Sequence, residues 1–171
     1  KKGILERVIF KSTETNTYLM ADAYDGAKMK QTVIDFLSAS SGNLTEEVKI
    51  DSLKLSFGEK AELLAFVGHN GLMDFNLDTT FMPKDNKKRD VMILACYSKS
   101  YFNSYIKQCN ANPLVWTTGL MAAEAYTLKW AIDGWLKKEN AAQIKERAAQ
   151  AYNTYQKCGI KGARYLFTSG F

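Results

Sequence analysis

The sequence is poor in residues that bind metals or form disulfides, with one histidine and three cysteines among its 171 residues. A four-ligand zinc site of Cys and His alone would need all of them, at spacings unlike common zinc motifs. The odd number of cysteines, none in a CxxC pair, excludes a disulfide framework that uses every one. We therefore expect no metal and no other cofactor, and at least one thiol that is free or paired with another molecule.

Long apolar runs are also missing, so we expect no membrane-spanning segment. Hydrophobic residues make up 46% and charged residues 24% of the chain, a balance typical of a globular protein. The net charge of +5 is mild, and the densest basic stretch, residues 84–89, is short and adjoins Asp90. We interpret it as a solvated loop and expect no nucleic-acid partner. The length suits one domain over residues 1–171, from which an N-terminal strand or a pro-region could be missing.

Three common motifs are absent as well: GxSxG, the P-loop and GxGxxG. A hydrolase of the α/β type or a nucleotide-binding protein is therefore a weak alternative. The chain does not begin with methionine, from which we expect a processed or trimmed product and a bacterial envelope or secreted location. The sequence does not indicate an oligomeric state.

Apolar runs alternate with helical periodicity along the chain. Short continuous apolar runs predict buried strands at residues 62–67 and 91–96, and a third strand is predicted at residues 113–117. Further expected strands lie at residues 5–12 and 17–22, and expected helices start near residues 26, 99, 121 and 141. Residues 44–60 fit a short strand or a loop equally well, residues 72–80 a small β excursion, and residues 163–167 an edge strand or packed tail. This alternation predicts an α/β fold with a central, mainly parallel sheet and helices on both faces.

Two of the predicted buried strands end in residues that can carry chemistry, His69 and Cys96. Ligands of open α/β sheets bind outside the carboxyl ends of the strands, where both side chains would emerge if the strands are neighbours. A cysteine nucleophile needs a base, and His69 is the only histidine. Cys109 and Cys158 fall near predicted helix ends, so Cys96 is the expected nucleophile. The amides of Gly71 and Cys96 could stabilise an oxyanion, at roughly 3–4 kcal/mol per donor.

The segments LLAFVGHNG (residues 63–71) and VMILACYS (residues 91–98) resemble the His-Gly and Ala-Cys motifs of the caspase-like cysteine peptidases, which include caspases, legumains, gingipains and clostripain. Residues 18–37 are similar to the first strand–helix unit of this family. The resemblance implies a three-layer α/β/α sandwich, with Cys96 as nucleophile and His69 as acid–base. The family usually has glycine directly after histidine, where its N–H serves the oxyanion hole. Asn70 intervenes here, so either Asn70 supplies that N–H or the loop is reshaped.

Two functions follow as hypotheses: a cysteine endopeptidase acting on polypeptides, and an inactive caspase-like module that binds a peptide or protein. Read singly, Cys96 could be a buried structural thiol and His69 a turn residue. In family members that prefer basic residues an acidic side chain lines the substrate pocket. The resemblance points to Asp22 for this role, with Asp74 and Asp78 as rivals, whereas Asp25 also fits a helix N-cap. A peptidase of this kind would cleave after basic residues.

Overall fold

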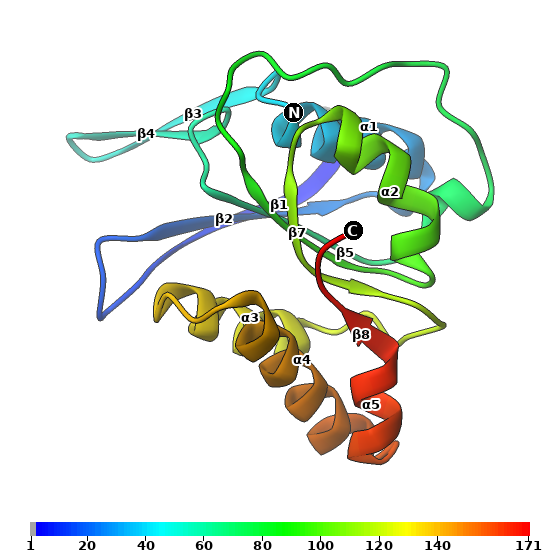
Figure 1. Cartoon of the computed structure of the whole chain (residues 1–171). Coiled ribbons are helices and arrows are strands. Elements are labelled where there is room, and N and C mark those ends of the chain that lie inside the picture. The colour runs from blue at the N-terminus through cyan, green and yellow to red at the C-terminus, as the bar shows by residue number, and fades with distance from the viewer. Residues whose placement is uncertain (1–2) are drawn as a thin grey trace.

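The computed structural model describes residues 3–171, and its centre is a four-stranded sheet (Figure 1). The strands are β5 (Leu63–Val67), β6 (Asp90–Leu94), β7 (Asn112–Thr117) and β8 (Phe167–Thr168), in that spatial order. β6 pairs in parallel with β5 and with β7, whereas β8 runs antiparallel to β7. The prediction of an α/β fold with a mainly parallel central sheet is confirmed.

Helices pack on both faces of this sheet. Val91 and Ile93 of β6 share one core with α1 (Met29–Ser40) and α2 (Ser98–Gln108). Met92 and Leu94 share the other with α3 (Ala125–Leu136) and α4 (Ala141–Gln156). The four β6 side chains from Val91 to Leu94 are fully buried. Each of these four contributes about 1.5–3 kcal/mol by leaving water, which explains why β6 is apolar at every position after Asp90.

The helix ends follow local sequence signals in two places. Asn140 begins α4 with a capping box, in which its side chain and that of Gln143 each accept from the other residue's backbone N–H, both at 3.0 Å. Asp25 caps the short 3₁₀ helix η1 (Gly26–Lys28) that leads into α1. The chain end differs from expectation, because α5 (Ile160–Leu166) occupies most of the predicted edge strand or tail and only β8 is extended.

Two β-hairpins lie outside the central sheet. β1 (Ile4–Lys11) pairs with β2 (Tyr18–Tyr24), and β3 (Thr45–Ile50) pairs with β4 (Leu53–Gly58), each as a separate antiparallel pair. Both extend beyond the sheet in Figure 1. Residues 18–37 resemble the first strand–helix unit of the caspase-like peptidases. In the described chain this segment begins with β2, a hairpin strand that is not hydrogen-bonded to the central sheet. Residues 44–60 resolve into the second hairpin.

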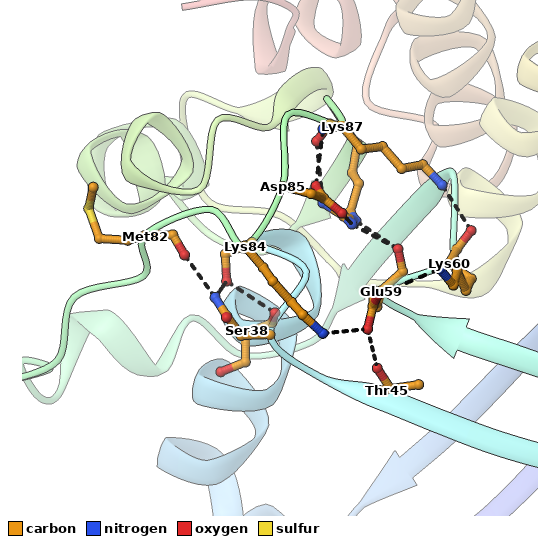
Figure 2. A network of polar contacts seen from close by, with 11 residues as sticks. Ser38, Thr45, Glu59, Lys60, Met82, Lys84, Asp85 and Lys87 are labelled. Carbon is orange, nitrogen blue, oxygen red and sulfur yellow. Dashed lines mark hydrogen bonds and ion pairs between the residues drawn. The ribbon is translucent and has the colours of Figure 1, made fainter.

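A long connection, residues 74–89, links the 3₁₀ helix η2 (Gly71–Met73) to β6 and contains no helix or strand, so the predicted β excursion at residues 72–80 is wrong. Polar contacts hold its second half (Figure 2). Lys84 Nζ donates to Glu59 at 2.8 Å, and Glu59 also accepts from Thr45 at 2.8 Å. Arg89, fully buried, donates to both carboxylate oxygens of Asp85.

Within residues 3–171, no helix has both the length and the apolar character needed to cross a membrane.

Candidate functional site

The ends of β5 and β6 bring His69 and Cys96 to one edge of the sheet. Val67 and Leu94, the last residues of the two strands, are directly paired, and the Gly68 amide donates to the Leu94 carbonyl at 3.1 Å. His69 and Cys96 thus each follow by two residues the end of neighbouring parallel strands. We call residues 68–74 the histidine loop and residues 95–97 the cysteine loop.

Asn70 ties the two loops together. Its side-chain amide donates to the carbonyl of Cys96 at 2.7 Å, and its side-chain oxygen accepts from the Leu72 amide at 3.1 Å. Asn70 is fully buried. The residue that departs from the family pattern is therefore the one that holds the cysteine loop to the histidine loop. Sequence reasoning considered only its backbone N–H and missed this side-chain role.

The imidazole of His69 has a carboxylate partner. His69 Nε2 lies 2.5 Å from Asp74 Oδ2, and the two side chains are 56% and 61% exposed. Asp74 was predicted as a pocket acid, and the structure instead places it against the ring. In the neutral tautomer that donates Nε2–H to Asp74, Nδ1 carries the free lone pair. The pair fixes the ring and leaves one nitrogen able to accept a proton.

Cys96 is half-buried against the loop that joins β7 to α3, residues 118–124, which we call the β7–α3 loop. The Met121 amide donates to Cys96 Sγ at 3.4 Å, and the thiol donates to the Met121 carbonyl at 3.5 Å. The Ala122 amide in turn donates to Tyr152 Oη on α4 at 3.0 Å, which anchors the loop. A backbone N–H is therefore directed at the sulfur.

The cysteine loop is held by a buried hydroxyl pair, Ser98 and Thr117. Ser98 Oγ donates to the Ile93 carbonyl at 2.8 Å, the Ser98 amide donates to Thr117 Oγ1 at 3.1 Å, and Thr117 Oγ1 donates to the Ala95 carbonyl. Tyr97 has a left-handed backbone (φ 48°), which costs of order 1–3 kcal/mol in a non-glycine residue. The hydroxyl pair explains how the turn persists. Thr117 is the last residue of β7, and Ser98 follows the end of β6 by four residues. Polar residues so close to two apolar strand ends are the sequence signal that could have revealed the pair.

Of the three residues predicted to form the oxyanion hole, Gly71 has its backbone N–H engaged in another hydrogen bond. The Gly71 amide donates to the His69 carbonyl at 3.1 Å, so it is engaged within the turn and does not point outward as predicted. A Cβ at this position would approach Met29 Cγ to 2.5 Å, so the glycine is required by packing. The backbone N–H groups of Asn70 and Cys96 donate none of the loop or side-chain hydrogen bonds found in residues 3–171.

The other predicted pocket acids are occupied or lie elsewhere in the chain. Asp22, on β2, forms a two-point ion pair with Arg7 of β1, at 2.6 and 2.7 Å, and so is not the free carboxylate that the pocket prediction needs. Asp25 accepts from the Ala27 amide at 2.9 Å as a cap. Asp78 is exposed on the long connection. Of the predicted acids, only Asp74 contacts a residue of the candidate site.

The remaining thiols differ from Cys96 in burial. Burial raises the pKa of Cys109 from 9.0 to about 12, whereas Cys158 is exposed.

Within residues 3–171, no three or more His, Cys, Asp or Glu side chains gather as a metal site. Comparisons of the chain with protein families, with curated proteins and with solved structures return no significant match.

Proposed function

We propose that the chain is a cysteine endopeptidase of caspase-like three-layer α/β/α architecture, with Cys96 as nucleophile and His69 as acid–base. One observation carries the proposal: both residues follow neighbouring parallel strands at one sheet edge, and Asn70 bonds the cysteine loop at Cys96 itself, at 2.7 Å. Asp74 is the positioning residue, because it contacts the imidazole and not the reacting atoms.

The proposed reaction has two steps, formation of a thioester on Cys96 and its hydrolysis. His69 takes the thiol proton, and the sulfur of Cys96 attacks the peptide carbonyl carbon. The tetrahedral oxyanion is stabilised by the free backbone amides of Asn70 and Cys96. The C–N bond then breaks, and the imidazolium gives its proton to the departing amine, leaving a thioester. In the second step His69 takes a proton from water, and the hydroxide attacks the thioester carbon. The C–S bond breaks to release the acid, and the imidazolium returns its proton to the sulfur, which restores the thiol.

A second candidate function is an inactive module that binds a peptide. One observation favours it: within residues 3–171 no hydrogen bond joins His69 to Cys96, because the thiol contacts Met121 and the ring contacts Asp74. Apo sites often tighten only when substrate is bound, so this geometry is compatible with both functions.

Hydrolysis of an unfolded protein substrate such as casein tests the proposal. Cys96→Ala and His69→Ala should each lower the rate at least about a hundredfold while circular dichroism shows an unchanged fold. Cys158→Ala, which removes an exposed thiol, is the matched control and should retain full activity. The binding-module alternative gains support if the wild type binds peptides, cleaves none, and Cys96 reacts with iodoacetamide no faster than Cys158.

A further inference from the structure

The loops around the candidate site carry almost no charge. Residues 67–73, 95–98 and 117–123 contain no acidic or basic side chain other than His69. Two acidic residues border these segments. Asp74 is engaged with His69, and Glu124 is exposed at the start of α3. The three segments therefore offer no carboxylate to a basic substrate side chain, and the carboxylate of Asp22 is paired with Arg7. Only Glu124, outside the segments, could make such a contact.

Exposed large apolar side chains instead occur in these loops and in the strand end and helix turn that adjoin them. The five residues that we call the apolar rim are between 38% and 67% exposed: Val67, Met73, Tyr97, Tyr101 and Leu120. Val67 precedes the histidine loop and Met73 lies within it, directly before Asp74. Exposed apolar side chains scattered singly need no explanation, whereas a group gathered at one site indicates a binding surface.

Backbone contacts place three of the rim residues, Tyr97, Tyr101 and Leu120, next to the thiol. Tyr97 follows Cys96 directly, and the Tyr101 amide donates to the Tyr97 carbonyl at 3.3 Å, so the two tyrosines lie one helical turn apart. The Tyr97 amide donates to the Gly119 carbonyl at 2.8 Å, which places Leu120 beside this turn. Leu120 also precedes Met121, whose backbone contacts Cys96 Sγ. These three residues therefore border Cys96, whereas Val67 and Met73 border His69 along the chain.

We propose that the apolar rim binds an apolar side chain of the polypeptide substrate next to the cleaved bond, so that Leu, Met or Phe is preferred there over Arg, Lys or Asp. This rests on the proposed peptidase function and replaces the expected preference for basic residues. The physical reason is that a charged side chain would lose water at these loops without gaining a partner, whereas an apolar one gains by leaving water.

The test is a set of fluorogenic peptides that differ only in the residue before the cleaved bond. The kcat/KM values for Leu, Met and Phe should exceed those for Arg, Lys and Asp by at least about tenfold. Leu120→Ser should lower kcat/KM for the Leu peptide about threefold to tenfold and leave the rate of Cys96 alkylation by iodoacetamide unchanged. Leu5→Ser is the matched control, since Leu5 is 73% exposed on β1 and Leu120 is 67% exposed.

The outcomes separate the two proposals. Cleavage that is faster after Arg or Lys, and slowed by Glu124→Gln, would overturn the apolar preference and leave the peptidase function standing. Equal losses in Leu120→Ser and Leu5→Ser would also overturn it. If no peptide is cleaved and Cys96 is no more reactive than Cys158, the peptidase function fails and the inference fails with it.

Discussion

The side-chain amide of Asn70 donates a hydrogen bond to the carbonyl of Cys96 at 2.7 Å, which joins the loops after two neighbouring strands. The bond is fully buried at its donor end, where an unmet partner is most costly. The proposed nucleophile is thus positioned through its own backbone by the residue that follows the proposed base.

Substituting Asn70 should therefore lower the stability of the fold. Asn70→Ala should lower the free energy of unfolding by about 1–3 kcal/mol, measured by urea denaturation. Asn70→Asp keeps the acceptor for the Leu72 amide but cannot donate to Cys96 when ionised, so it separates the two bonds. Asn76→Ala, an exposed change nearby, is the control. Equal stability of Asn70→Ala and Asn76→Ala would contradict the bridging role.

Loss of the Asp74 carboxylate should slow turnover more than it weakens substrate binding. We expect Asp74→Asn to lower kcat by about tenfold or more with little change in KM, because the ring of His69 loses its orientation. Stability should change by less than about 1 kcal/mol, since both side chains of the pair are more than half exposed. Asp74→Glu should recover part of the rate. A change in KM alone would show that Asp74 binds substrate instead.

Cys109 should make stability fall in the alkaline range. Burial raises the pKa of this thiol from 9.0 to about 12 in the folded protein, so the folded state holds its proton more tightly. This contribution to stability is complete below about pH 9 and is lost as the pH rises to about 12. Unfolding measured across this range should show a weaker pH dependence for Cys109→Ala than for the wild type, whereas Cys158→Ala should change nothing.

Glu59 should make the stability of the fold decrease at acid pH. The hydrogen bond from Lys84, then that from Thr45, lowers the pKa of this carboxyl from 4.5 to about 2. The stability it contributes is present above about pH 4.5 and is lost as the pH falls towards 2. Lys84→Met should therefore reduce the acid-dependent loss of stability in urea denaturation. Lys88→Met, an exposed change in the same connection, should not; if it does so equally, the Lys84 contact is not the cause.

The sequence alone predicted three strands of the central sheet, β5, β6 and β7. The apolar runs at residues 62–67 and 91–96 predicted the strands β5 and β6, which pair in parallel. The expected burial holds for Val91–Leu94 of β6, whereas only Phe66 of β5 is buried. The start of α4 at Asn140 was also predictable from neighbouring residues, because its capping box lies within four residues. His69 and Cys96 could be placed at one edge because strand direction fixes where strand ends meet.

Tertiary structure decided what each loop residue does. The bond of Asn70 to Cys96 spans 26 residues and the ion pair of Asp22 with Arg7 spans 15, and nothing in the local pattern encodes either partner. The sequence placed Gly71 in the site, but its amide donates to the His69 carbonyl, and Met29 and Phe75 leave no room for a Cβ at this position. Buried strands are specified residue by residue through burial, whereas polar loop contacts are specified only by which distant segments the completed fold brings together.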